Sequence, residues 1–331
     1  MALVPLSLLA AGCGKKQNAL APASHQSQDI ATLFWWMTGV AAVGLGVVVA
    51  LLLLAWIRSG RRGAGGDTQG AKPGERVGWY VVLTGGVLVP ILLISALFVI
   101  GDVFVIRTTE APAAGSTKRT ILVIGHQWWW EVRYPGTSAV TANEIHIPAR
   151  TPVRLEVRTA DVIHSFWVPE LNRKIDTLPG STNEIELYAD AVGRYRGDCA
   201  EFCGLQHAHM GIWVYADPPA KFAKWLARQS RPAAPPTGAQ ASAGRAAFLS
   251  GACANCHQIR GTSASSGVGP DLTHVADRET LGALTIPNTP SYLHDWIRNS
   301  QRFKPGNQMP SFNGLPEREI RDLVAYLEER K

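Results

Sequence analysis

The stretch GDCAEFCGLQHAHMG, residues 197–211, places two cysteines, two histidines and a methionine within fifteen residues. Cys199 and Cys203 are four residues apart, His207 follows four residues later, and Met210 three residues after that. Zinc fingers place their histidine ligands well downstream of the cysteines, and a thioether is a poor zinc ligand. Cysteine, histidine and a weak methionine are the ligands of copper electron-transfer sites. The spacing therefore favours copper over zinc, although a zinc site remains an alternative.

The second cysteine of this stretch has a consequence for the kind of copper site. A mononuclear blue copper site needs one cysteine, so two cysteines beside a histidine and a methionine indicate two coppers bridged by two thiolates. Such a centre needs another histidine, and His164 in DVIHSFWVP lies at a predicted strand end about 35 residues upstream. A Cys199–Cys203 disulfide is the alternative that an oxidising compartment permits. His209 adjoins His207, but the spacing to Met210 selects His207.

Two long stretches of the chain, residues 30–57 and 77–101, carry no charge. Each exceeds the roughly 20 apolar residues that cross a bilayer, so we predict a transmembrane hairpin over residues 30–107. Its helices are expected over about 30–57 and 77–104. The loop between them is rich in arginine and lysine, which places it in the cytoplasm and both termini on the outer face.

The N-terminal residues, 1–29, resemble a signal or lipoprotein segment. LLAAGC ends at Cys13, which would be the acylated residue of a bacterial lipoprotein. The chain has alanine where the lipoprotein pattern usually has leucine, and no basic segment precedes the apolar run. An ordinary signal peptide or a disordered tail with an idle cysteine is the alternative.

The rest of the chain divides by composition. Residues 108–228 contain short β-rich runs bounded by proline, glycine and asparagine, which predict an all-β domain. Residues 229–243 form a Pro/Ala-rich linker. Residues 244–331 show helical patterns and predict a small all-α domain. The net charge of +6 is dispersed rather than gathered in basic blocks, so no nucleic-acid partner is expected.

The C-terminal domain contains CANCH at residues 253–257, the C-x-x-C-H motif of covalent haem attachment. Cys253 and Cys256 would bind the haem, with His257 as one axial ligand. Met309 lies 52 residues downstream and is the candidate for the other, since Met/His ligation is typical of cytochromes c. The GPDL segment at 269–272 resembles the loop that supports the proximal histidine of class I cytochromes c. A thioredoxin-like CxxC pair is the alternative, but it needs a βαβ pattern that the sequence does not show.

The copper motif, together with DVIHSF, GHQWWWEVRY (125–134) and KIDTLPG (174–180), resembles the CuA domain of cytochrome c oxidase subunit II. The resemblance covers roughly residues 30–225 and implies a cupredoxin-like Greek-key fold. It implies a dinuclear CuA centre held by six residues, with Glu201 contributing its backbone carbonyl: His164, Cys199, Glu201, Cys203, His207 and Met210. The Glu201 side chain would point toward a Mg²⁺ ion at the interface with subunit I.

The family also implies a role for the aromatic run. Its first aromatic residue, Trp128 here, would be the surface residue through which electrons reach copper. If Trp128, Trp129 and Trp130 lie in one strand, their side chains alternate between faces. At least one is then exposed or at an interface, and core packing is expected for Trp129 or for both of its neighbours.

The resemblance implies a subunit of a bacterial respiratory oxidase with a fused cytochrome c domain. Electrons would pass from haem c to CuA and then to subunit I, where O₂ is reduced to water and protons are pumped. Subunits I and III, the cell membrane, and a soluble cytochrome c or another donor would be its partners, with both redox domains on the periplasmic face. Many relatives carry a glutamate early in the second transmembrane helix, whereas residues 77–101 contain no carboxylate and the nearest is Glu75.

Three other functions remain open at this point. A CuA centre also serves some nitric oxide reductases, whose copper subunit would look similar. A membrane-anchored copper-delivery protein would explain the two cysteines but not the remaining ligands together with a covalent haem. Quinol-oxidase subunits share the scaffold but lack the copper ligands, which disfavours them.

Overall fold

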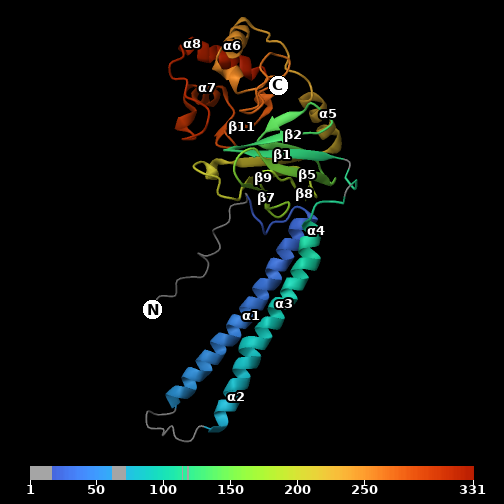
Figure 1. The fold of residues 1–331 in the computed structure, drawn as a ribbon, viewed down its shortest axis with the longest axis vertical. Coiled ribbons are helices and arrows are strands. Elements are labelled where there is room, and N and C mark those ends of the chain that lie inside the picture. Colours follow the sequence, from blue (N-terminus) through green and yellow to red (C-terminus); the bar gives the residue numbers. More distant parts are fainter. Residues whose placement is uncertain (1–16, 62–71, 114, 118) are drawn as a thin grey trace. The chain divides into compact units, whose positions relative to one another are not determined.

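The computed structural model describes residues 17–61, 72–113, 115–117 and 119–331, which form two compact units. One unit is Gln28–Thr109, and the other joins the N-terminal residues up to Ser27 with Glu110–Lys331. Cys13 lies outside the described residues, so its acylation stays a prediction. Figure 1 shows the ribbon with its elements labelled.

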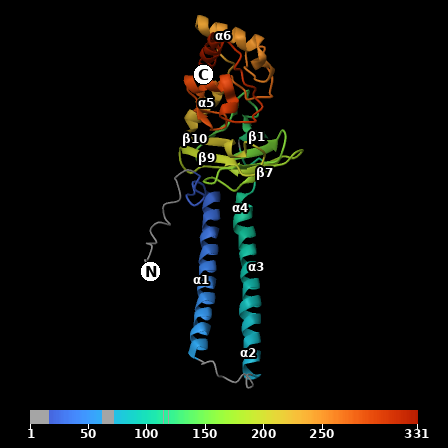
Figure 2. The same ribbon diagram turned by 90° about the vertical axis from the view of Figure 1, so that its left-hand side faces the viewer.

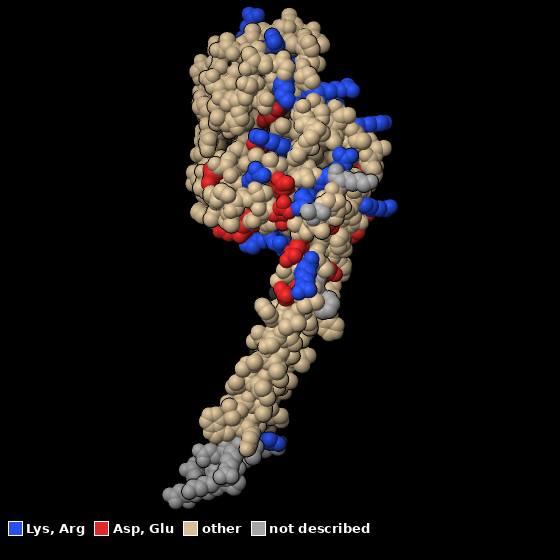
Figure 3. Space-filling model, turned by 45° about the vertical axis from the view of Figure 1, so that its right-hand side comes forward, with Lys and Arg blue, Asp and Glu red and all other residues tan. Residues whose placement is uncertain are grey.

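The first unit is a hairpin of two long helices that run side by side in both views (Figures 1 and 2). Its apolar stretches, His25–Arg58 and Gly78–Gly101, are long enough to cross a membrane. Figure 3 shows that the middle of the hairpin carries no charged side chain on the face drawn. The first helix is α1 (His25–Arg61), and the second is a continuous run of α2 (Lys72–Leu83), η3 (Thr84–Leu88), α3 (Val89–Gly101), η4 (Asp102–Ile106) and α4 (Arg107–Thr109).

Both helices are longer than the predicted ranges of 30–57 and 77–104. The prediction followed the uncharged residues, whereas backbone hydrogen bonding continues into the polar residues at each end. The segments η3 and η4 are π-helical turns within the second helix.

The β domain of the second unit is built from two five-stranded sheets, which confirms the predicted all-β fold. In β1 and β5, buried and half-buried residues alternate, as expected for strands with one face on the core. The first sheet has the order β3 (Val140–Ala142), β2 (Trp129–Arg133), β1 (Thr120–His126), β5 (Val153–Thr159), β8 (Asn183–Leu187). The second has the order β4 (Glu144–Pro148), β10 (Gly211–Asp217), β9 (Gly193–Cys199), β6 (His164–Trp167), β7 (Ile175–Thr177).

A short N-terminal segment is attached to this β domain. The backbone N–H of Ala23 donates to the carbonyl of Glu170 at 2.8 Å, and the Ala23 carbonyl accepts from Asp190 N–H at 2.9 Å. The Ser27 hydroxyl also donates to the Glu170 carbonyl. These bonds hold the chain against the β domain just before the hairpin begins.

The C-terminal domain is helical, as predicted. The helix α5 (Pro219–Gln229) precedes this domain. The first helix of the domain itself starts inside the predicted linker of 229–243, because the Ala-rich run AQASAGRAAF favours helix. Its elements are α6 (Ala239–Ser250), η6 (Ala252–Asn255), η7 (Val275–Asp277), β11 (Thr280–Leu281), β12 (Ile286–Pro287), α7 (Pro290–Asn299), η8 (Ser300–Arg302) and α8 (Glu317–Glu328).

One glycine determines how closely α6 and α8 approach. A Cβ atom on Gly244 would lie 1.8 Å from the backbone oxygen of Asp322, so only glycine fits at this crossing. Phe248 and Tyr326 then pack in the same buried cluster, with ring centroids 5.8 Å apart. This helix pair forms one wall of the C-terminal domain core.

Candidate copper centre and haem pocket

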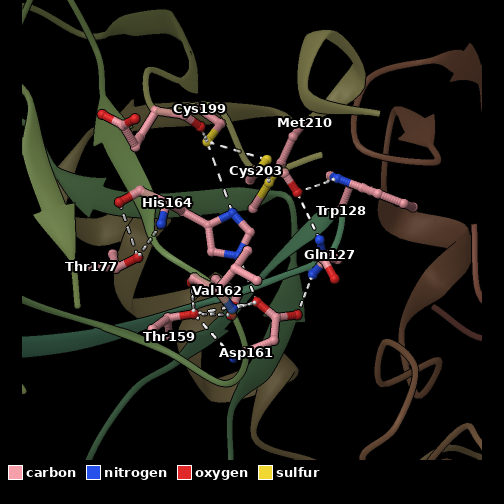
Figure 4. Close-up of polar contacts among 12 residues, drawn as sticks. Gln127, Trp128, Thr159, Asp161, Val162, His164, Thr177, Cys199, Cys203 and Met210 are labelled. Atoms are coloured by element: carbon pink, nitrogen blue, oxygen red, sulfur yellow. Dashed lines mark hydrogen bonds and ion pairs between the residues drawn. The ribbon is translucent and has the colours of Figure 1, made fainter. Parts of the chain in front are cut away.

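The structure brings all six predicted copper ligands together at one end of the β domain. Figure 4 shows His164, Cys199, Cys203 and Met210 of this set. The sulfurs of Cys199 and Cys203 lie 3.8 Å apart, and both thiols are free. Cys199 Sγ is 3.9 Å from Nδ1 of His164 and 3.2 Å from the Glu201 carbonyl oxygen. Cys203 Sγ is 3.6 Å from His207 Nδ1 and 3.8 Å from Met210 Sδ.

Strand pairing explains why residues so distant in sequence meet here. His164 begins β6 and Cys199 ends β9, and these strands pair with Phe166 opposite Cys199. The ligand loop then returns through η5 (His207–His209) into β10. The N–H of Cys199 donates to the carbonyl of Met210 at 3.0 Å, which closes the base of the loop.

The donor set fits copper. Two thiolates, two imidazole nitrogens and a thioether are soft or borderline ligands that copper electron-transfer sites use. His164 and Met210 are fully buried, and the two cysteines are almost so. Burial in the rigid sheet keeps the ligands in place and excludes water.

Asp161 supports His164 from behind. Its Oδ1 lies 2.8 Å from His164 Nε2, and its Oδ2 accepts from the Gln127 N–H at 2.6 Å. Burial opposes ionisation of Asp161, but the hydrogen bonds from His164 and the backbone outweigh it and lower its pKa. A metal-binding histidine commonly has a carboxylate partner on its other nitrogen, which orients the ring. Asp161 was not among the predicted site residues, although it belongs to the same D-V-x-H segment as His164.

The cysteines differ in their protonation. The hydrogen bond between the two sulfurs lowers the pKa of Cys199 far below its usual range, although burial opposes this, and His164 adds to the effect. The same interaction, together with burial, raises the pKa of Cys203. The contact thus favours a thiolate at Cys199, and the thiolate is the form of cysteine that binds metal.

The three tryptophans do not lie in one strand, so that assumption was wrong. Gln127 and Trp128 form the turn between β1 and β2, and the strand begins only at Trp129. Trp130 is fully buried, whereas Trp129 is half-buried and stacks on His126. Trp128 is half-buried, and its indole N–H donates to the Cys203 carbonyl at 3.0 Å.

The same carbonyl has a second donor in this turn. The side-chain amide of Gln127 donates to the Cys203 oxygen at 2.7 Å. Figure 4 shows both side chains directed at this one carbonyl. The turn at 127–128 is therefore bound directly to a predicted copper ligand.

The predicted haem ligands line one large, mostly apolar pocket in the C-terminal domain: Cys253, Cys256, His257 and Met309. Phe248, Leu293, Ile297 and Leu323 contribute apolar walls. Residues of the β domain, including Trp128 and Asn143, also line it. A pocket of this chemistry suits a flat apolar macrocycle attached through two thiols.

One ring nitrogen of the predicted haem ligand His257 has a backbone partner. Its Nδ1 lies 2.8 Å from the Pro270 carbonyl, which confirms the expected support by the GPDL loop. Burial lowers the pKa of His257, which favours the neutral ring, the form that ligates metal. Gly269 packs against the ring so closely that a Cβ there would lie 2.6 Å from Cε1.

A buried lysine lies between the two sites. Lys304, 3% exposed, donates to the carbonyls of Trp128 and His209 at 2.6 Å each and of Gly282 at 2.9 Å. Burial lowers the pKa of Lys304 to about 7. Lys304 was not among the predicted site residues, because a single lysine in a polar segment matches no motif.

Residues 136–216 match the family described as the periplasmic domain of cytochrome c oxidase subunit II, and residues 241–331 match cytochrome c. Cytochrome c oxidase subunit 2 of Alkalihalophilus pseudofirmus OF4 is 32% identical over 331 aligned residues, 98% of this chain and 95% of the relative. The Bacillus subtilis 168 protein of that name is 26% identical over 100% and 96%. The solved periplasmic domain of cytochrome oxidase subunit II from Bradyrhizobium japonicum is 32% identical, covering 34% of this chain and 94% of that one, with a TM-score of 0.34.

The two domain matches imply copper in the β domain and haem in the C-terminal domain. The two apolar helices and the periplasmic domain fit a membrane protein with an external domain, acting in a complex with other oxidase subunits. The relative from A. pseudofirmus is matched along nearly its whole length. The chain therefore belongs to the cytochrome c oxidase subunit 2 family, as a member with a C-terminal cytochrome c domain.

Proposed function

We propose that this chain receives electrons for a respiratory haem-copper oxidase of the bacterial cell membrane. Electrons that arrive at the haem of the C-terminal domain would pass to a dinuclear CuA centre and on to subunit I. There O₂ would be reduced to water with proton pumping. Subunit III and a soluble cytochrome c or other donor would complete the set of partners, with both redox domains on the periplasmic face.

The observation that carries this proposal is the position of Trp128. Its side chain lines the pocket that holds the CANCH motif, and its indole N–H bonds the carbonyl of Cys203. One residue thus contacts both candidate redox sites. This supports Trp128 as the residue through which electrons reach copper, with the fused haem domain as their source.

Each site residue has a definite task in this proposal. The copper ligands would be His164, Cys199, Cys203, His207, Met210 and the carbonyl of Glu201. When bound, the metal pair supplies one-electron chemistry with the charge spread over two ions. The protein holds the ligands: strand pairing fixes His164 and Cys199, and Asp161 fixes the imidazole ring. The Mg²⁺ ion expected near the Glu201 side chain stays part of the proposal.

In the haem domain, Cys253 and Cys256 would form the two thioether bonds. His257 and Met309 would be the axial ligands, and Met/His ligation raises the haem potential. The Met309 loop is well anchored: its carbonyl accepts from Ser300 Oγ and from the Gln301 amide, both at 2.9 Å. A loop held in this way keeps the thioether at the pocket.

The test uses the intact complex and two neighbouring histidines. We expect His207→Asn to abolish oxygen consumption driven through the haem, while the haem itself is still reduced by an external donor. His209→Asn is the matched control, because that side chain bonds Gln206 rather than a sulfur. Equal oxygen consumption in both variants would contradict the copper role. Reduction of nitric oxide in place of O₂ by the wild-type complex would contradict the proposed acceptor.

A further inference from the structure

We propose that Lys304 is a positioning residue that fixes the haem domain on the copper-ligand loop and so sets the haem-to-copper electron-transfer geometry. This inference rests on the proposed function. The three hydrogen bonds of the Lys304 amine join three segments: the turn at Trp128, the ligand loop at His209, and the haem-pocket rim at Gly282. No other side chain described above contacts all three.

The hydrogen bonds of Lys304 suit a contact that holds the haem domain and the β domain in one position. The Lys304 amine lies 2.6–2.9 Å from three carbonyl oxygens, and its protonated form has three donors, one for each of them. All three acceptors are neutral backbone oxygens, and the amine is 3% exposed. A buried cation without an anionic partner is costly. A neutral side chain would avoid that cost, so the position of Lys304 is better explained by the three carbonyls that it holds together.

The acceptors lie next to the groups that matter for electron transfer. His209 is flanked within the ligand loop by His207 and Met210. Trp128 bonds the Cys203 carbonyl through its indole. On the haem side, the Lys304 carbonyl accepts from Asn307 at 2.7 Å, and Asn307 Oδ1 accepts from the Met309 N–H at 2.8 Å. Lys304 therefore links the copper loop to the loop that carries Met309.

Neighbouring contacts also hold the copper-ligand loop against the segment that follows Lys304. Gln206 of the ligand loop donates to the Pro305 carbonyl at 2.6 Å. Leu205 packs so closely on Gly306 that a Cβ there would lie 2.6 Å from its Cδ2. Elsewhere along the contact, Arg194 pairs with Glu279, but both of these side chains are about half exposed. Salt screens such an exposed pair and leaves a buried contact largely unaffected.

The test measures haem-to-copper transfer in the intact complex after flash reduction of the haem by an external photoreductant. Lys304→Met keeps the side-chain length and removes all three donors. We expect transfer on the order of tenfold slower, since a misplacement of about 1 Å can cost up to about 100-fold in rate. The haem midpoint potential and the copper electron paramagnetic resonance spectrum should match the wild type. The matched control is Arg302→Met, which removes an exposed charge from the same loop.

Lys304→Arg covers the case in which Lys304→Met does not accumulate with both cofactors. Arginine keeps the charge, but its planar fork does not present three converging donors at one point, so slower transfer is again expected. Wild-type rates in the accumulating variants would overturn the inference. A slower rate with a shifted haem potential would also overturn it, because Lys304 would then act on driving force. Absence of haem-to-copper transfer in the wild type itself would instead contradict the proposed function.

Discussion

At the scale of single residues, most of the candidate ligands could be proposed from the sequence because they are concentrated in two short stretches. The five metal-capable groups in residues 197–211 and the CANCH motif can be recognised from their spacing in the sequence. Asp161 and Lys304 could not be found in this way. Asp161 lies only three residues before His164, but its contact with the ring depends on how the chain turns into β6. Lys304 contacts Trp128, which is 176 residues away in the sequence. Only the folded chain brings such pairs together.

Gly269 offers a direct test of the haem ligand. In Gly269→Ala the new methyl group would lie 2.6 Å from Cε1 of His257, so the ring must move away from its position. We expect the haem to remain attached through its cysteines but to lose the normal His ligation, seen in its visible and electron paramagnetic resonance spectra. Gly267→Ala is the control, since no atom lies within 4 Å of the added carbon. Identical spectra for both variants would contradict the assignment of His257.

A substitution at Asp161 tests the assignment of the copper centre. Asp161→Asn removes the carboxylate that orients His164, and loss of such a partner lowers metal affinity by about 10–100-fold. The measurement is the copper retained by the intact complex during titration with a chelator. The exposed Asp190→Asn serves as control. Unchanged copper retention in Asp161→Asn would show that His164 needs no support or is not a ligand.

At the scale of elements, composition predicted their kinds but not their limits. Uncharged residues located both long helices, yet α1 and the second helical run extend several residues into polar sequence. The expected alternation of the three tryptophans supposed that they share one strand, whereas the strand begins at Trp129 and Gln127 and Trp128 form a turn that bonds the Cys203 carbonyl. Tertiary hydrogen bonds outweighed local propensity at that turn.

The packing of α6 on α8 gives a prediction at this scale. Gly244→Ala places a carbon 1.8 Å from the Asp322 oxygen, and a backbone atom cannot yield as a flexible side chain can. Alanine favours helix by about 1 kcal/mol over glycine, but overpacking costs about 1–3 kcal/mol or more. We expect a net loss of stability, with the thermal transition of the haem signal lowered by several degrees. Gly314→Ala, which meets no atom within 4 Å, should leave that transition in place.

At the scale of the whole molecule, the sequence predicted the order of parts: an apolar hairpin, a β domain and a helical haem domain. It did not reveal how the haem domain meets the β domain. That contact is made by scattered single residues, such as Arg260, which donates to the carbonyl of Ser138 in the β domain. Scattered backbone acceptors have no sequence signature, so the joint is visible only in the fold.

The central claim is that one chain carries a dinuclear copper centre and a covalent haem. The most direct test is the metal content and electron paramagnetic resonance spectrum of the intact complex, counted per copy of this chain after the metals of subunit I are subtracted. The account predicts two coppers at the thiolate site, one haem on CANCH, and an unpaired electron shared by both coppers. A single labile copper, or zinc, beside an attached haem would contradict it. The protein would then be a membrane-bound cytochrome c whose β domain has another role.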